Sequence, residues 1–228
     1  MTLQLRSGQN ASNSATGTAP TATLPATPVQ GNLLIACVSA NSGTTTPAAN
    51  GYTSFKGQKV SSDTWDFYWK IAGASEPAAQ AACTLGTSRA WAYGVAEFED
   101  TGGGTWTLDV DNSQISNGTN PITPTVTPTS SIAALLVASY NSQAGQTYST
   151  HEVNNDATGV VEIVDQASGT STSTGMAYLI VASTSGTYAA DATRSATSNG
   201  CAGIAIFRSV VAGGTAIHRH LTLTGAGL

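Results

Sequence analysis

Two groups of acidic residues carry the side chains of this sequence that could perform acid–base or cation chemistry. Glu97 and Glu99 alternate within an apolar run, so both carboxyls would share one face of a strand, next to Asp100. A pair of carboxyls held about 5 to 10 Å apart can hydrolyse a glycosidic bond. No histidine and no second acidic segment supports this pair, so we expect a structural use for it.

The second group is the segment DVDN. Asp109, Asp111 and the adjacent Asn112 place oxygen ligands at strand spacing, where they could hold a hard cation such as calcium. The glycine and glutamate that a calcium loop requires at fixed spacing are missing. We therefore favour a polar cluster at the entry to a turn.

The three histidines offer a possible metal site. His218 and His220 share one face of a strand and could give two ligands, with a third from His151, a carboxylate or a symmetry-related copy. Solvent exposure or a docking contact is the alternative for this pair. We expect no bound metal and no cofactor.

Aromatic side chains could bind sugars, because their faces stack on the C–H surfaces of a pyranose ring. Trp65, Trp91 and Trp106 are the candidates for this stacking. The alternative is that they fill the core, which suits the alternation of Trp65 and Trp69 along an apolar face. No Ser–His–Asp series, phosphate-binding loop or paired Cys-x-x-Cys motif is present, and we expect a protein that is not an enzyme.

Composition excludes further classes of function. Charged residues make up only 9% of the 228 residues, the net charge is −5, and the eight basic residues are dispersed. Nucleic acid and anionic membranes both demand a basic surface, so neither is an expected partner. The start of the chain lacks the apolar core of a secretory signal, and no apolar run is long enough to span a bilayer. We expect synthesis and folding in a cytoplasm, with Cys37, Cys83 and Cys201 buried and reduced.

Three blocks of sequence recur in the same order in the two halves of the chain. They are LLIACVSANS and ALLVASYNS at a shift of 100, YWKIAG and YLIVAS at a shift of 110, and GVAEF and GIAIF at a shift of 109. The shift of 100 superposes Ile35 on Leu135. A shared order of three blocks predicts a duplicated set of strands.

The spacing of apolar residues is that of β-strands. In TWDFYWKI, residues 65, 67, 69 and 71 occupy one face and 66, 68 and 70 the other. In RAWAYGVAEF both faces are apolar or small, so this strand should be covered on both sides. About a dozen short strands separated by Gly, Ser, Thr and Asn clusters, without a credible helix, predict an all-β antiparallel sandwich built from two related halves.

The distribution of apolar residues along the sequence divides the chain into three parts. Residues 1–28 are predicted to be an N-terminal lead-in, in which TLQLR is a short strand candidate and residues 9–28 have no apolar period and are irregular. Residues 29–209 form the sandwich as one domain, with the proline-spaced segment 117–131 as a crossover rather than a linker. Residues 210–228 have no counterpart in the first half and are predicted to be a C-terminal arm.

Seven motifs follow one another along the chain: GNLLIACVSANS, GYTSF, DTWDFYWKIAGASEP, SRAWAYGVAEFEDTGG, ITPTVTPTSS, IAALLVASYNS and GCAGIAIFRS, with Arg208 at the closing position. This ordered series resembles a β-sandwich that recurs in bacteriophage virion proteins and bacterial surface proteins. This resemblance spans residues 29–209. It implies a jelly-roll-like fold and a structural or adhesive role, and it carries no catalytic residues.

The resemblance and the composition together predict a phage virion structural protein, either a capsid decoration (cement) protein or a head or tail fibre component. The expected partners are the major capsid protein or another virion protein, with a homotrimer as the expected oligomer. The docking face of the arm would be Ile217, Arg219, Leu221 and Leu223, which alternate with the histidines. The alternative is a carbohydrate-binding module of an adhesin or receptor-binding tail protein, whose ligand is a host surface glycan.

Overall fold

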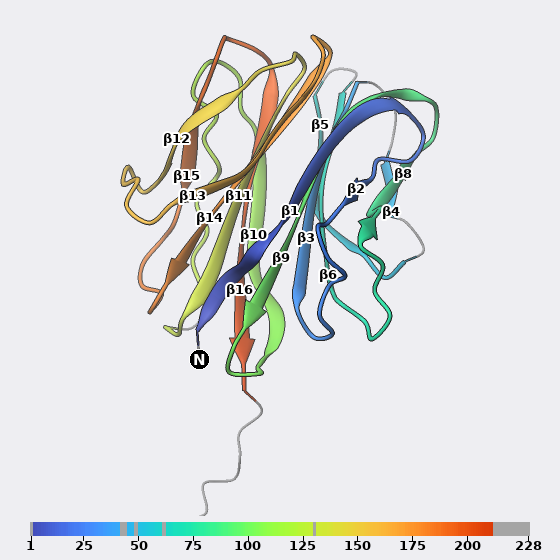
Figure 1. Cartoon of the computed structure of the whole chain (residues 1–228). Coiled ribbons are helices and arrows are strands. Elements are labelled where there is room, and N and C mark those ends of the chain that lie inside the picture. Colours follow the sequence, from blue (N-terminus) through green and yellow to red (C-terminus); the bar gives the residue numbers. More distant parts are fainter. Residues whose placement is uncertain (1, 42–44, 48–49, 61–62, 130, 212–228) are drawn as a thin grey trace, which may run out of the picture.

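The structure, a computed structural model, describes residues 2–41, 45–47, 50–60, 63–129 and 131–211. Within these ranges the chain forms β-strands joined by turns and loops. Figure 1 shows two facing layers of strands, with no helix in these ranges. The strands are β1 (Leu3–Gly17), β2 (Ala22–Thr23), β3 (Leu33–Ala40), β4 (Thr45–Pro47), β5 (Thr53–Val60), β6 (Asp63–Ile71), β7 (Ala79–Gln80), β8 (Cys83–Leu85), β9 (Arg89–Asp100), β10 (Thr105–Ile115), β11 (Ala134–Ser142), β12 (Tyr148–Val153), β13 (Val161–Ser168), β14 (Thr172–Val181), β15 (Ala190–Arg194) and β16 (Gly200–Val210).

The long strands form two antiparallel sheets of five strands each. The first sheet has the order β1-β9-β3-β6-β5, and the second has the order β10-β16-β11-β14-β13. The short strands pair as β2 with β7, β4 with β8, and β12 with β15. The predicted all-β antiparallel sandwich of two related halves is confirmed, and the long strands of each half stay together in one sheet.

The two sheets repeat one topology. Strands β1, β3, β5, β6 and β9 correspond in order and position to β10, β11, β13, β14 and β16. Contacts between the sheets are reciprocal, because β1 packs against β13 while β10 packs against β5. The halves are therefore related by an approximate two-fold axis, and the chain passes from one to the other at the turn between β9 and β10.

The strand pairing corrects the alignment of the repeat. Leu33 on β3 pairs with Phe98 on β9, just as Leu135 on β11 pairs with Phe207 on β16. The first block is thus repeated at a shift of 102 (33 to 135) and the third at 109 (98 to 207). The partners of the two leucines on β6 and β14 are residues 71 and 180, again 109 apart. The predicted shifts of 100 and 110 are wrong, and the one-residue error in the second block would have reversed the face of every side chain.

The prediction of an irregular segment is wrong for residues 9–17, because Leu3–Gly17 is the edge strand β1. Most of its side chains are exposed or half-buried, and its ladder with β9 shifts register between Leu5 and Asn10, so the sequence shows no apolar period. The segment after β1 also has a counterpart. Leu24 is buried against the outer face of the first sheet, as Val126 is against the second.

The segment 117–131 crosses the outer face of the second sheet. It forms β-bridges from Ile122 to Asp191 and from Val126 to Tyr188. It therefore connects β10 to β11 within the second half, as the crossover interpretation predicted, and does not link two domains.

Three layers of apolar side chains hold the sandwich together. The central core lies between the sheets and contains the inward faces of β3, β6, β9, β11, β14 and β16. A second core covers the outer face of the first sheet with side chains from β2, β8 and the neighbouring connections, and a third covers the second sheet with β12, β15 and the 117–131 crossover. The predicted two-sided burial of the strand at 91–98 is confirmed, and so are the two faces predicted for residues 65–71.

Equivalent glycines let the two sheets approach each other. A Cβ on Gly94 would lie 2.6 Å from both methyl groups of Val164, and one on Gly203 would lie 2.7 Å from Phe67 and closer still to Trp65. These glycines open the repeated blocks GVAEF and GIAIF. Their recurrence is explained by packing, because a side chain from the opposite sheet occupies the space above each of them.

All three cysteines are buried and free, as predicted. Burial raises the pKa of the Cys37 thiol to about 11 and the pKa values of the Cys83 and Cys201 thiols to about 12. All but the first two residues of the predicted arm, 212–228, lie outside the described residues. Val210 still belongs to β16, and its side chain and that of Val211 are half exposed.

We predict that Gly203→Ala lowers the free energy of unfolding by about 1 to 3 kcal/mol, because the added methyl overpacks the central core. Gly73→Ala is the matched control, since a Cβ there meets no atom within 4 Å. Urea unfolding measures both. Equal stability of the two variants would contradict the close approach of the sheets at Gly203.

Candidate functional site

The buried carboxylate of Glu97 organises one end of the sandwich, where β9 and β16 end and β3 and β11 begin. Its side chain is fully buried, and Arg6 on β1 donates to Oε2 at 2.9 Å. Oε1 accepts from the backbone N–H of Val29 at 2.8 Å and from the side-chain amide of Asn32 at 2.6 Å. Glu97 thus fixes the segment that leads into β3, and its burial leaves no access for a substrate.

The second half holds a matching ion pair with the charges exchanged. Arg208 on β16 donates to Asp109 on β10 at 2.8 Å, and the Asp109 side chain is almost fully buried. Thr129 donates its backbone N–H to the Asp109 carboxylate, and its hydroxyl accepts from Arg208. In the first half, the backbone carbonyl of Thr27 similarly accepts from Arg6. Each pair therefore ties the end of a Thr/Pro-rich connection to its sheet. Asp109 is committed to this role rather than available to a cation.

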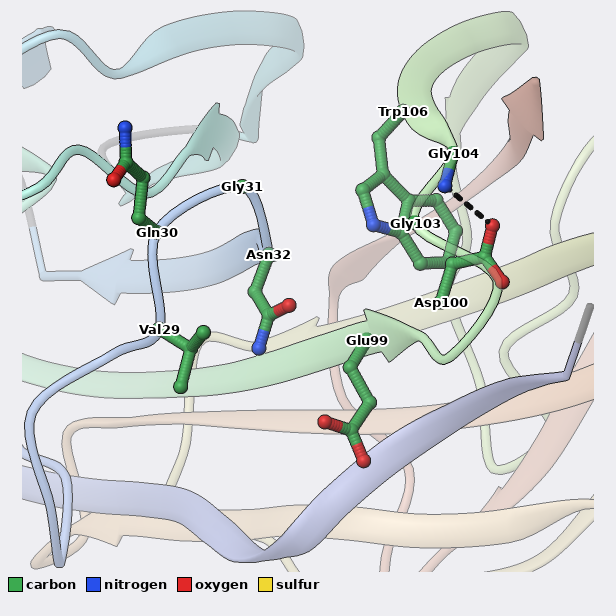
Figure 2. A pocket seen from close by; sticks show the side chains of 9 residues that line it. All are labelled: Val29, Gln30, Gly31, Asn32, Glu99, Asp100, Gly103, Gly104 and Trp106. Carbon is green, nitrogen blue, oxygen red and sulfur yellow. Dashed lines mark hydrogen bonds between the residues drawn. The ribbon is translucent and has the colours of Figure 1, made fainter. Parts of the chain in front are cut away.

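A cleft of about 330 Å³ opens beside the first ion pair (Figure 2). The segment from Val29 to Asn32 forms one side, and the β9–β10 turn with Trp106 forms the other. Glu99 and Asp100 add two carboxylates to this lining. The cleft is thus acidic, with an apolar contribution from Val29, whose side chain is 46% exposed.

Asp100 fixes the turn that forms the second side of the cleft. Its carboxylate accepts from the backbone N–H groups of Gly102 and Gly104 and from the Ser209 hydroxyl, at 2.7 to 3.0 Å. Partial burial alone would raise the pKa of Asp100, but these hydrogen bonds outweigh it and hold the pKa below its ordinary value. Asp100 is therefore ionised at neutral pH and couples the turn to the last residues of β16.

Glu99 is the carboxylate of this group with the fewest structural ties. It is half-buried, and Oε1 accepts from the side-chain amide of Gln4 at 2.5 Å. Glu97, two residues earlier, is enclosed by three donors. The two carboxyls that the sequence paired are therefore unequal, because one holds the fold and the other lines a cleft.

The tryptophans proposed for glycan stacking lie inside the protein. Trp65 and Trp106 belong to the central core and Trp91 to the outer core of the first sheet, and none is more than 3% exposed. Trp106 also lines the cleft. None of the three offers a sugar an open ring face, because each ring is packed within a core.

The histidines are not gathered into a site within the described residues. His151 is buried on β12, 2.8 Å from the carboxylate of Glu162, and burial lowers its pKa. His218 and His220 lie outside the described residues. Among the residues that are described, no three His, Cys, Asp or Glu side chains form a group that could hold a metal ion. The same residues include no helix of the length and hydropathy needed to cross a membrane.

Sequence reasoning missed the cleft because its residues come from two segments that are distant in the sequence, 29–32 and 99–106. Gln30 and Asn32 precede β3, and the glycines at 103 and 104 form a turn that the sequence marked only as a break between strands. Arg6 was the available signal. An arginine near a buried glutamate suggests an ion pair, but this needs the pairing of β1 with β9, which the sequence did not predict.

No protein-family model, curated protein or solved structure matches this chain. The arguments that follow therefore depend on the geometry of the end that carries the cleft and on the residues of the chain itself.

We predict that Glu97→Gln lowers the free energy of unfolding by about 3 kcal/mol, since removing one partner leaves the others of a buried pair uncompensated. Glu99→Gln, on the same strand, should change it by no more than about 0.5 kcal/mol because this side chain is partly exposed. Chemical denaturation of both variants measures the difference. A loss of similar size in both would contradict the structural role assigned to Glu97.

Proposed function

We propose that this protein is a structural component of a bacteriophage virion, either a capsid decoration (cement) protein or a head or tail fibre component. It would act by multivalent docking, with the sandwich as the rigid body and the C-terminal arm as the attachment element. The major capsid protein or another virion protein is the partner, and the protein is made in the host cytoplasm and assembled into the particle. A homotrimer follows from the family resemblance.

The observation that carries this proposal is the set of polar contacts that braces the end of the sandwich at which β16 ends. Ser209 is bonded to the β9–β10 turn, the two ion pairs brace both sheets at this end, and the chain continues beyond the half-exposed Val211. An attachment segment holds the sandwich in a fixed orientation only if the strand from which it extends is rigid. The series of motifs that resembles virion proteins supplies the biological setting.

The distribution of charge supports proteins as partners. Four of the eight basic residues are bonded within the sandwich, namely Arg6, Lys70, Arg194 and Arg208. Few cations remain for the phosphate contacts on which nucleic-acid binding depends. Enzymatic function gains no support from the buried Glu97, and we propose no cofactor.

The glycan-binding alternative has to rely on residues other than the three buried tryptophans. A glycan array with the intact protein decides between the two functions. Binding that disappears with a single surface substitution in a folded protein would favour the alternative.

We predict that quantitative mass spectrometry of purified virions finds this protein in many copies per particle. A chain truncated after Ala212 should retain the sandwich, because the central and outer cores are complete within the described residues, but should no longer bind the particle. Circular dichroism checks the fold and co-sedimentation with particles checks binding. Absence from virions, or undiminished binding of the truncated chain, would refute the proposal in its docking form.

A further inference from the structure

We propose that the acidic cleft beside the β9–β10 turn receives the C-terminal segment of a second copy of this chain, with Arg219 of the incoming segment placed against Glu99 and Asp100. This inference deepens the proposed docking function and rests on the arm being the attachment element. It makes the first partner of the arm another copy of the same protein, so that copies associate through arm and cleft.

The cleft has the chemistry to bind a long basic side chain. Its lining contains two carboxylates, the polar side chains of Gln30 and Asn32, and the exposed Val29 at one edge. Glu99 has a neutral partner in Gln4 and forms no ion pair with a cation of the described residues. Its negative charge is therefore available to an incoming cation, and the volume of about 330 Å³ accommodates one long side chain with its flanking backbone.

The C-terminal segment has the complementary composition. Its docking face, defined by the alternation of AIHRHLTL, places Arg219 between Ile217 and Leu221. A guanidinium forms paired hydrogen bonds with a carboxylate, and an apolar residue on each side suits a cleft with an apolar edge. No lysine and no other arginine lies within the last 20 residues of the chain, so Arg219 is the one permanent cation that this segment can offer.

The geometry favours a second copy over the molecule's own segment. Val210 pairs with Thr105 directly beside the cleft, and β16 points out of this end of the sandwich (Figure 1). Strand β16 therefore ends at the rim of its own cleft and points away from the body. Arg219 lies eight residues after Val211, and this segment spans up to about 28 Å when extended, which is enough to reach a second copy. Binding to the same cleft would instead require the chain to reverse its direction within these residues.

Charge-reversal variants of the full chain test the inference. Sedimentation velocity should show concentration-dependent association of the wild type, and Glu99→Arg or Arg219→Glu should each weaken it at least about tenfold, because each places like charges together. Both changes in one chain should restore association. Glu152→Arg, a reversal on β12 away from the cleft, is the matched control and should leave association unchanged. Glu99→Gln provides a second cleft variant should the arginine substitution impair folding.

A mixture of the two single variants tests whether arm and cleft bind each other between two chains. The Arg219→Glu chain keeps an intact cleft, and the Glu99→Arg chain keeps an intact arm, so an equimolar mixture should form a complex of one chain of each kind. A mixture that forms no complex overturns the inference. A wild type that stays monomeric at all concentrations also overturns it, because that is the result expected if the segment occupies its own cleft.

Failure of the arm–cleft inference and failure of the proposed virion function give different experimental results. Loss of particle binding on truncation together with no complex in the mixture removes the cleft as the receptor and leaves the virion role standing. A complex in the mixture with no protein in virions supports the cleft and refutes the virion role.

Discussion

The need to cover both faces of the central strands governs this structure. Strands β3, β9, β11 and β16 are buried along nearly their whole length, on both faces. One sheet can protect only the inner face of the other. The outer faces need separate cover, and the chain supplies it in each half from its connections and short strand pairs. The long Thr- and Pro-rich segments before β3 and β11 are therefore parts of the core architecture.

The polar groups of the interior reinforce the same arrangement at both ends. At one end, Asn141 of the second sheet donates to Ser39 of the first at 3.0 Å, and Ser39 also bonds Thr172. Ser39 and Asn141 are equivalent positions of the repeat (39 and 141, the shift of 102), so this contact lies near the approximate two-fold axis. At the other end, the two ion pairs hold each crossover to its own sheet. Hydrogen bonds and ion pairs are directional, so these buried polar groups fix the positions of the strands and crossovers, which apolar packing alone does not.

The sequence predicted strands and their burial correctly where the environment of the side chains repeats regularly along the strand. The two-fold period of residues 65–71 and the two-sided apolar run at 91–98 predicted strand type and burial, and the recurring glycines pointed to a duplicated sheet. It predicted only the start of β1, at TLQLR, because an edge strand with one register shift and few buried side chains leaves no period to detect. It also placed the repeat two residues out of register in the first block, since short apolar strands match at several shifts.

The candidate site was only partly predictable for a related reason. Glu97, Glu99, Asp100 and Asp109 were singled out as acidic residues, but their roles depend on partners distant in sequence, such as Arg6 and Arg208. Spacing alone could not distinguish a carboxylate enclosed by donors from one that lines a cleft. The tryptophans illustrate the same limit, because an aromatic residue in an alternating strand fits a core and a sugar platform equally until the opposite sheet is placed.

The central claim is that neither half is a folded unit without the other, since each supplies the inner cover of its partner. Splitting the chain in the turn between the halves, after Gly103, tests this most directly. Fragments 1–103 and 104–228 should each lack near-ultraviolet circular dichroism and cooperative unfolding when alone, and should regain both when mixed in equal amounts. A fragment that unfolds cooperatively by itself, with a defined near-ultraviolet spectrum, would contradict the account.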